Sequence, residues 1–390
     1  VVNANPWEQR KLIEVCDYVD YRGKTPTKTE NGIFLVTAKN VKDGFIDYET
    51  SKEYISENAY EEVMRRGKPE IGDVLITTEA PCGNVAQVNK ADIALAQRII
   101  KYRGHIGVVD NTYLKYYLLS PEFQKILNAK SSGGTVQGIK GSILHQQKII
   151  YPSYEEQKKI GQHMDSLDHL ITLHQRKCDE VKSLKKYMLQ KMFPQNEQKV
   201  PEIRFEGFTE AWEQRKLGEV FKEYSEKNHT ELSALTIIQG GGTVKREESD
   251  RNLMYDKSNL SNYKMVRKND FIVHLRSFEG GLEKSLLDGI ISPAYHTFHS
   301  DVADSRFYYP YFRSHEFIKH KLVPHVYGIR DGRSIDIAGM KTIEIPYTSI
   351  EEQRKIGDYL ESLDHLITLH QQKCEELKKI KKFMLQKMFV

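Results

Sequence analysis

A duplicated segment constrains the fold of this chain more than any other feature. Residues 155–193 and 351–389 are identical at 28 of 39 positions, and both contain SLDHLITLHQ, with the copies 196 positions apart. A shorter repeat, WEQRKL, occurs at 7–12 and again at 212–217. Internal repetition of this kind indicates repeated structural units. The chain is therefore predicted to have a pseudo-two-fold internal repeat.

Each copy of the long segment is predicted to form one helix. Both copies lack proline, contain one glycine near the start, and are rich in residues that favour helices. Apolar residues recur three and four positions apart, which is the pattern of a coiled-coil seam. An apolar seam needs a partner, and the other copy is the nearest candidate, with His174 and His370 fixing register rather than binding metal. The predicted seam residues are Ile160, Met164, Leu167, Ile171, His174, Ile356, Leu360, Leu363, Ile367 and His370.

The segments between the repeats differ from each other almost completely. The predicted organisation is a first variable domain at 1–154, a helix at 155–193, a linker at 194–212, a second variable domain at 213–350 and a helix at 351–390. The linker is polar and contains proline, as expected of a connection.

Both variable domains are expected to mix helices and strands. Strands are predicted at 33–36, 74–76, 271–273 and 342–345 from β-branched and aromatic runs. Short helices are predicted at 56–66, 111–119, 122–130 and 307–321. The predicted fold class is α+β, with two mixed α/β domains separated by two long repeated helices.

Composition limits the classes of protein that the chain can belong to. The net charge is only +4, from 58 basic and 54 acidic residues, which permits nucleic-acid binding without requiring it. Cys16, Cys82, Cys178 and Cys374 lack zinc-ligand spacing, so reduced thiols in the cytoplasm are expected. No run is long and apolar enough to span a bilayer, and no signal peptide precedes the first repeat. Because the chain opens Val1-Val2, we expect its natural N-terminus to be trimmed or altered.

Catalytic signatures are missing from the sequence. It has no GxxxxGK[ST] phosphate loop, no HExxH, no GxSxG and no amino-methyltransferase motif. We therefore expect no catalytic, cofactor-binding or metal-binding residues in this chain. Two alternatives stay open on these residues alone: a fused nuclease or methyltransferase, and a scaffold that binds proteins instead of DNA.

The loops of the variable domains carry the side-chain types that read DNA. Arg and Lys recognise guanine, and Asn and Gln recognise adenine, in the major groove. Glycine-punctuated loops such as TTEAPCGN and YGIRDGRS combine these types with conformational freedom. The predicted DNA-binding residues of the first domain are Arg22, Lys24, Lys28, Lys39, Asn40, Thr77, Thr78, Asn84, Gln97, Arg98, Gln137 and Lys140. Those of the second domain are Gln239, Lys245, Arg246, Arg276, Ser277, Lys284, Tyr295, His296, Tyr327, Arg330 and Arg333.

The whole arrangement resembles the specificity subunit of type I restriction–modification systems. The residues that carry the resemblance are the two EEQ-K/R-KIG helix openings, the lead-in PEIRFEGFTEAWEQRKLGEV at 201–220, and EEVMRRGKPEIGDVLITTEAPCGNVAQV at 61–88. KNDFIVHLRSFEGG and ISPAYHTF, at 268–281 and 291–298, are similar to another target-recognition sequence. The first WEQRKL departs from the pattern, because no VPEIRF-like segment precedes it.

The resemblance implies a DNA-recognition subunit without catalytic activity. Each variable domain would be a target-recognition domain that reads one half of a bipartite, asymmetric double-stranded DNA target. The two helices would form an antiparallel coiled coil, which would set the spacer between the half-sites and dock two DNA methyltransferase subunits. Two motor/nuclease subunits would complete the assembly in the bacterial cytoplasm. S-adenosylmethionine, ATP and Mg²⁺ would be bound by those partners.

Overall fold

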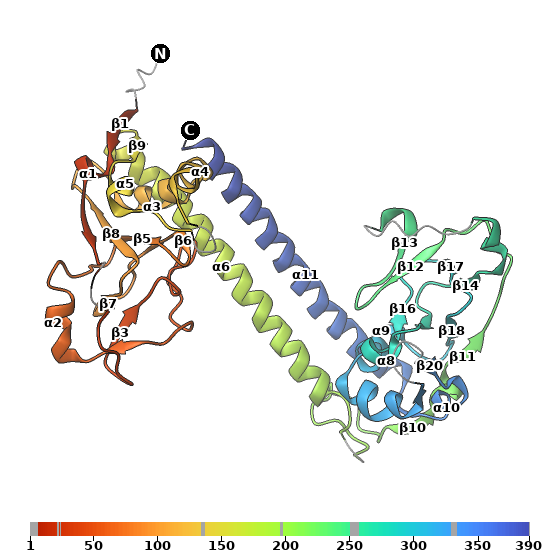
Figure 1. Ribbon diagram of the computed structural model, residues 1–390. Coiled ribbons are helices and arrows are strands. Elements are labelled where there is room, and N and C mark those ends of the chain that lie inside the picture. Colours follow the sequence, from red (N-terminus) through yellow and green to blue (C-terminus); the bar gives the residue numbers. More distant parts are fainter. Residues whose placement is uncertain are drawn as a thin grey trace. The chain divides into compact units, whose positions relative to one another are not determined.

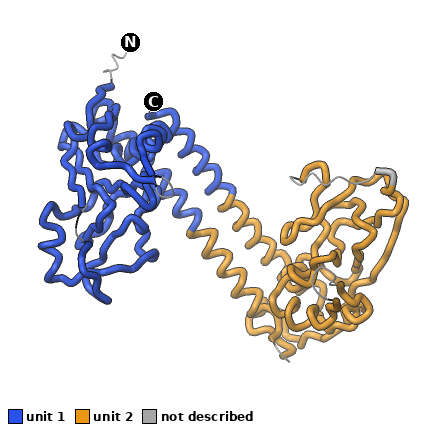
Figure 2. The backbone as a smooth tube through the Cα atoms, in the orientation of Figure 1, with its two compact units in different colours: residues 1–175, 372–390 blue, residues 176–371 orange. Residues whose placement is uncertain are grey.

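The computed structural model describes residues 7–21, 23, 25–133, 137–195, 198–249, 257–328 and 334–389. It divides into two compact units (Figure 2). Unit 1 comprises residues 1–175 and 372–390, and unit 2 comprises residues 176–371. Each unit thus joins one variable region to parts of both long helices.

Unit 1 is built on antiparallel strands. Strand β1 (Glu8–Lys11), which contains the repeated EQRK, pairs with β9 (Lys148–Tyr151). A four-stranded antiparallel sheet has the order β2-β8-β5-β6, and a second sheet has the order β4-β3-β7 with β3 and β7 parallel. The strands of these two sheets are β2 (Cys16–Asp20), β3 (Ile33–Val36), β4 (Tyr54–Ile55), β5 (Val74–Thr78), β6 (Cys82–Gln87), β7 (Ile93–Leu95) and β8 (Ile99–Gly104).

Short helices complete unit 1. The side chain of Asp110 accepts the amide of Tyr113 and Ser120 accepts the amide of Phe123, so each caps the helix that follows it. The helices are α1 (Leu12–Val15), η1 (Glu57–Ala59), α2 (Tyr60–Val63), α3 (Asn111–Leu119), α4 (Pro121–Lys130) and α5 (Gly141–His145).

Unit 2 repeats the pair of end strands and the four-stranded sheet of unit 1 although its variable sequence is different, and its remaining strands pair differently. The repeated EQRK forms β10 (Glu213–Lys216), which pairs with β21 (Glu344–Tyr347) in the register of the β1–β9 pair. A four-stranded antiparallel sheet follows, with β11 (Lys222–Tyr224), β18 (His296–His299), β15 (Phe271–Val273) and β16 (Glu283–Lys284) in that order. Two-stranded pairs are β12 (Leu235–Ile238) with β13 (Gly242–Lys245), β14 (Lys264–Val266) with β17 (Gly289–Ile291), and β19 (Val326–Tyr327) with β20 (Ser334–Ile335).

Among the helices of unit 2 is a counterpart of α3. Asp304 caps α9 as Asp110 caps α3, by accepting an amide of the first turn. The helices are α7 (Leu217–Val220), η2 (Arg246–Glu248), η3 (Lys257–Asn262), α8 (Ser277–Gly280), α9 (Ser305–Phe312), the π-helix η4 (Glu316–Leu322), η5 (Val323–His325) and α10 (Ile337–Met340).

The long helices are α6 (Tyr154–Lys191) and α11 (Ile350–Lys387), each of 38 residues (Figure 1). In unit 1 the carboxylate of Asp168 accepts the ammonium of Lys381, and Cys374 Sγ lies 3.9 Å from the Ile171 carbonyl oxygen. In unit 2 Lys185 meets Asp364. Rising numbers on one helix meet falling numbers on the other, so the pairing is antiparallel, as predicted.

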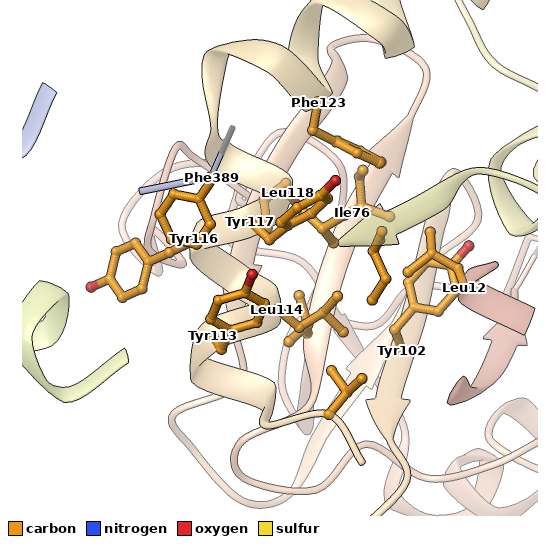
Figure 3. Close-up of a cluster of buried hydrophobic side chains, with 14 of the residues drawn as sticks. Leu12, Ile76, Tyr102, Tyr113, Leu114, Tyr116, Tyr117, Leu118, Phe123 and Phe389 are labelled. Atoms are coloured by element: carbon orange, nitrogen blue, oxygen red, sulfur yellow. The ribbon is translucent and has the colours of Figure 1, made fainter. Parts of the chain in front are cut away.

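Each unit buries its own hydrophobic core, and the end of a long helix contributes to it. Phe389, just beyond α11, packs against Tyr113 and Tyr117 of α3 in unit 1, with ring centroids 5.4 and 6.0 Å apart (Figure 3). Phe193, just beyond α6, stacks on Phe307 and Tyr311 of unit 2. The phenylalanine of the repeated QKMF sequence therefore packs the end of each long helix into the core of a mixed domain.

Most predicted elements are present, and three differ clearly in their limits. The predicted helix at 56–66 begins as the 3-10 turn η1 and ends with α2 at Val63. The predicted strand at 342–345 begins at Glu344, because the amides of Thr342 and Ile343 close the turn after α10. The predicted helix at 307–321 is interrupted after Phe312, and the Ser314 hydroxyl accepts the Phe317 amide at the start of η4.

Candidate nucleic-acid interface

The glutamine of each EEQ motif anchors a mixed domain to its long helix. Gln157 is fully buried; its Oε1 accepts the Asp110 amide at 2.9 Å, and its Nε2 donates to two backbone carbonyls. Gln353 is equally buried and accepts the Asp304 amide at 3.0 Å. The same side chain thus positions the N-cap aspartate of α3 in unit 1 and of α9 in unit 2.

The glycine four positions after each glutamine lets the long helix approach the capped helix closely. In unit 1 α6 approaches α3, and in unit 2 α11 approaches α9. A Cβ atom on Gly161 would lie 3.1 Å from the Thr112 side chain, and one on Gly357 would lie 3.0 Å from the Arg306 Cβ. Both distances are shorter than ordinary van der Waals contact. Glutamine and glycine together explain why the EEQxKIG opening accompanies both domains.

Unit 1 has two hollows on its variable surface. Hollow 1, of about 270 Å³, lies where β3, β5 and β7 end. Hollow 2, also of about 270 Å³, lies beside α2. The residues of hollow 1 include Thr25, Lys28, Leu35, Lys39, Gln97 and Arg98, and those of hollow 2 include Thr25, Glu62, Arg65, Arg66 and Gln97. Four of the predicted DNA-binding residues, Lys28, Lys39, Gln97 and Arg98, are thereby brought together.

Three predicted residues of unit 1 are buried. Asn40 is fully enclosed; its Oδ1 accepts the Thr37 amide and hydroxyl, and its Nδ2 donates to the Asp47 carbonyl oxygen. Thr77 and Thr78 lie in β5, whose residues are all buried. These side chains hold loops in place, so we leave them out of the proposed interface.

The other predicted residues of unit 1 lie elsewhere. Asn84 is half-buried, and its side chain donates to the Val41 carbonyl oxygen at 2.8 Å. Gln137 and Lys140 are exposed just before α5. Arg22 and Lys24 lie outside the described residues.

In unit 2 a buried glutamate organises the glycine-rich loop. Glu283 is fully buried and accepts the amides of Gly240 and Gly242, the hydroxyl of Tyr309 and the guanidinium of Arg313. Four donors satisfy the buried charge.

Two predicted residues of unit 2 are enclosed close to this cluster. Ser277 is buried and accepts the His274 amide through its hydroxyl. Lys284 is buried, and burial lowers the pKa of its ammonium. We leave Ser277 and Lys284 out of the proposed interface as well.

The remaining predicted residues of unit 2 are more accessible. Gln239, Lys245, Arg276 and Tyr327 are exposed. Three half-buried residues have specific contacts: the guanidinium of Arg246 lies over the Tyr263 ring, Tyr295 accepts Lys264 through its carbonyl oxygen, and His296 pairs with Glu223. Arg330 and Arg333 lie outside the described residues.

The predicted seam is buried towards the mixed domains and partly open towards the middle. The buried seam residues are Ile160, Met164, Leu167, Ile356, Leu360 and Leu363, and the half-buried ones are Ile171, His174, Ile367 and His370. Beside the seam, the Asp168 carboxylate accepts hydrogen bonds from the Lys381 ammonium and from the Tyr116 hydroxyl within the chain.

Both long helices also expose an apolar stripe outside the seam, which the sequence analysis missed. On α6 the exposed pairs are Leu170–Leu173 and Leu184–Tyr187, and Lys177 and Glu180 form an ion pair of 2.7 Å between them. On α11 the stripe repeats 196 positions later, with Leu366, Leu369, Ile380 and Phe383 flanking the Lys373–Glu376 pair. In the sequence, apolar residues that recur three positions apart indicate this stripe. Apolar side chains repeated on exposed helix faces indicate a protein-binding surface.

The described residues offer no site for a metal ion, because nowhere in them do three His, Cys, Asp or Glu side chains gather suitably. Among the helices that the structure describes, none combines the length and apolar character needed to cross a bilayer.

Comparison with known proteins decides the family. The model of the type I restriction modification DNA specificity domain matches twice, at residues 4–183 and 209–379. The chain belongs to this family. Each match includes one variable region and most of one long helix, so the sequence repeat corresponds to a repeated family domain.

Individual relatives are similar to this chain over nearly its full length. The MjaVIII specificity subunit of a type I restriction enzyme from Methanocaldococcus jannaschii is 25% identical over 399 residues, covering 96% of this chain and 91% of the relative. The S subunit of a type I restriction–modification system from M. genitalium has a TM-score of 0.62 at 16% identity, covering 100% and 97%. A chain from a structural study of type I complex assembly and conformational transition has a TM-score of 0.51 at 19% identity, covering 100% and 99%. These structures share the fold.

Membership establishes the role of this specificity subunit. It is a DNA-recognition component of a type I restriction–modification system, and it contributes recognition rather than catalysis. The alternatives of a fused enzyme and of a scaffold that does not bind DNA have no support.

Proposed function

We propose that each unit of this specificity subunit reads one half of a bipartite DNA target. The observation that carries the proposal is one scaffold used twice with different exposed loops. The order of the four-stranded sheet, the capping aspartate and the buried glutamine correspond in the two units, whereas the loop residues differ. Regions 1–154 and 213–350 would be the two target-recognition domains, and because their loops differ, the target would be asymmetric.

The exposed and half-exposed candidates form the proposed interface. In unit 1 they are Lys28, Lys39, Asn84, Gln97, Arg98, Gln137 and Lys140. In unit 2 they are Gln239, Lys245, Arg246, Arg276, Tyr295, His296 and Tyr327. Arginines and lysines among them supply phosphate contacts as well as base contacts, which makes affinity dependent on salt.

The exposed apolar stripes are the proposed docking surfaces for two methyltransferase subunits. Unit 1 contains Leu170 and Leu173 with Ile380 and Phe383, and unit 2 contains the counterparts 196 positions away. Two copies of one surface fit two copies of one partner. Those subunits would bind S-adenosylmethionine, and two motor/nuclease subunits would use ATP and Mg²⁺.

Selection from a random double-stranded DNA pool tests the recognition proposal. The full chain in complex with its methyltransferase subunits should enrich two unlike half-sites with a fixed spacer. Exchange of residues 13–154 for another domain of the family should change one half-site and leave the other intact. Enrichment of no split motif, or a change in both half-sites, would contradict the proposal.

Native mass spectrometry tests the docking surfaces. The double variant Leu170→Glu/Leu173→Glu should retain one methyltransferase subunit instead of two, and Leu366→Glu/Leu369→Glu should do the same. Lys182→Glu, at an exposed position outside the stripe, is the matched control and should retain both. If both double variants retain both methyltransferase subunits, the stripes are not the docking surfaces.

A further inference from the structure

Gln97 and Thr25 lie on a ridge between the two hollows of unit 1. Both residues line hollow 1 and hollow 2, so they form the wall that the hollows share. The Gln97 side chain is fixed on this wall, because its Nε2 donates to Thr25 Oγ1 at 3.0 Å. A ridge with a hollow on each side has the shape of an element that enters a groove.

The ridge lies at the carboxyl ends of two neighbouring strands, β3 and β7. β3 and β7 run parallel with Val36 opposite Leu95, so their carboxyl ends meet at one edge. Loops at such edges present binding residues on a rigid base. The turn that follows is tight: Arg98 has a φ of 74°, and its carbonyl oxygen accepts the Thr78 amide at 2.9 Å. A left-handed conformation is unfavourable for a residue with a β-carbon and is held only where the surroundings enforce it.

Basic residues surround both hollows, and the ridge itself is neutral. Hollow 1 has Lys28, Lys39 and Arg98 at its rim above a buried apolar floor that includes Leu35. Hollow 2 has the exposed Arg65 and Arg66. Since the two backbones of a duplex flank each groove, cations on both sides of a ridge match a ridge inserted between two phosphate rows.

Acidic residues in the same area are partly neutralised by these cations. Glu53 pairs with Lys28 at 2.8 Å, and Glu79 pairs with Arg98 at 3.4 Å. Glu62 lines hollow 2 beside the two arginines. Around hollow 1 the three basic residues therefore outnumber the two acidic ones, and Lys39 carries much of the excess positive charge.

The amide of Gln97 retains the pair of groups that adenine requires. A primary amide has two N–H donors and one carbonyl acceptor. Thr25 occupies one donor, which leaves one N–H and the carbonyl oxygen. Adenine presents N7 as acceptor and N6–H as donor in the major groove, and a glutamine amide satisfies both at once.

We propose that Gln97, oriented by Thr25, reads an adenine in the half-site recognised by unit 1, while the basic residues of the two hollows hold the flanking phosphates. This inference rests on the proposed function, that unit 1 reads DNA. It goes further by assigning one base contact to one side chain. Arg65 and Arg66 enter the interface here for the first time.

The first test is selection from random DNA with the full chain and its methyltransferase subunits. Gln97→Ala should lose the preference for A·T at one position of one half-site, with a loss in affinity of roughly 5- to 150-fold for the original site. Gln9→Ala, an exposed glutamine on β1 of the same unit, is the matched control and should leave the motif unchanged. Gln97→Arg should move the preference at that position from adenine to guanine. An unchanged motif in Gln97→Ala overturns the proposal.

A modified base tests the atomic contact. Replacing the assigned adenine with 7-deazaadenine removes N7, so the wild-type subunit should lose binding and Gln97→Ala should show no further loss. Equal losses in both proteins would place N7 against another residue and exclude Gln97. Release of a methyltransferase subunit by Gln97→Ala, seen by native mass spectrometry, would identify the ridge as a protein contact and equally overturn the proposal.

The phosphate contacts have their own readout. Arg98→Ala, Lys39→Ala and Arg65→Ala should each weaken binding to all sequences and reduce the slope of log affinity against log salt by about 1. Arg10→Ala, on exposed β1, should leave the slope unchanged. If the slope is unchanged in all three variants, the residues of the two hollows do not contact the DNA phosphates. If the wild-type complex enriches no split motif at all, the proposed function itself fails, and this outcome is distinct from a motif that only ignores Gln97.

Discussion

The two units place the same residue of the repeat in opposite environments. Glu352, in the first turn of α11, is fully buried and accepts Arg204 through both carboxylate oxygens, at 2.6 and 2.8 Å, and Trp212 Nε1 at 3.1 Å. Glu156, its counterpart 196 positions earlier in α6, is exposed. Arg204 comes from the segment that leads into the second WEQRKL. The repeat therefore fixes the helix, while neighbouring sequence decides what each of its residues does.

Glu352→Gln should have the largest effect on stability. It leaves the Arg204 guanidinium buried without its counter-charge, and breaking a buried pair in this way costs about 3–5 kcal/mol. Glu156→Gln is the matched control and should stay within about 0.5 kcal/mol, as exposed substitutions do. Hydrogen exchange on the intact chain measures both, because peptides of unit 1 and unit 2 report separately. Equal changes in the two units would show that the surroundings of the two glutamates do not matter.

The second prediction concerns His274, a half-buried histidine of unit 2. Burial, together with nearby Arg313, lowers the pKa of His274 to about 4, and within the described residues its buried Nε2 has no hydrogen-bond partner. The unfolded chain binds this proton near pH 6.5 and the folded chain only near pH 4. Stability of unit 2 should therefore fall as pH is lowered from about 6.5 to 4, by at most about 3 kcal/mol.

His299 gives the control for this pH dependence. The hydrogen bond to Asp270 raises the pKa of His299, so its contribution is present below about pH 6.5 and is lost as pH rises through the raised value. In His274→Asn the exchange protection of unit 2 should no longer fall at acid pH. In His299→Asn it should still fall, as in the wild-type chain. An acid loss that persists in His274→Asn would assign it to other groups.

The third prediction concerns a feature that the units share. Gln157→Ala should destabilise unit 1, and Gln353→Ala should destabilise unit 2, by about 1–3 kcal/mol each, because each leaves buried backbone groups without partners. Each variant should spare the other unit. Loss of exchange protection throughout the chain in either variant would show that the units do not unfold separately.

The sequence was informative where one physical rule dominates. The seam was predictable because burial of an apolar stripe is the main driving force of a two-helix coil, and α3 was predictable because Asp110 caps a strongly apolar run. The helix predicted at 307–321 was wrong in its middle, since Ser314 suits both a helix and a cap, and only the tertiary structure selects between them.

Side-chain roles in the variable loops were less predictable. Asn40 and Gln97 are both amides that follow a strand, yet Asn40 is buried as the hydrogen-bonding centre of a loop and Gln97 lines two hollows. Residue type specifies which hydrogen bonds a side chain can form, but not whether their partners lie inside the protein or outside it. Thr77 and Thr78 illustrate the same limit, because both faces of β5 are covered and alternation along the strand indicates no exposed side.

The smallest predicted effect distinguishes the two copies of SLDHLITLHQ themselves. Asp364 pairs with Lys185, and its side chain is 51% exposed. Asp168 is less exposed, at 30%, and accepts both Lys381 and the hydroxyl of Tyr116, whose pKa is raised by burial and by Asp168, which keeps it a donor. Asp364→Ala should cost less than about 0.5 kcal/mol, as exposed pairs do. Asp168→Ala should cost about 1 kcal/mol, because a partly buried hydrogen bond is lost as well.

A double-mutant cycle separates the two contributions to the Asp168 effect. The Tyr116 hydroxyl also donates to Asp165 Oδ1 at 2.8 Å, so Tyr116→Phe in the Asp168→Ala background should remove only this remaining hydrogen bond. Lys185→Ala should fully account for the effect of Asp364→Ala. Exchange protection of α3 and α6 in unit 1, and of α11 in unit 2, is the measurement. Equal costs at Asp168 and Asp364 would mean that the Tyr116 contact does not contribute. The two copies would then be equivalent in stability as well as in sequence.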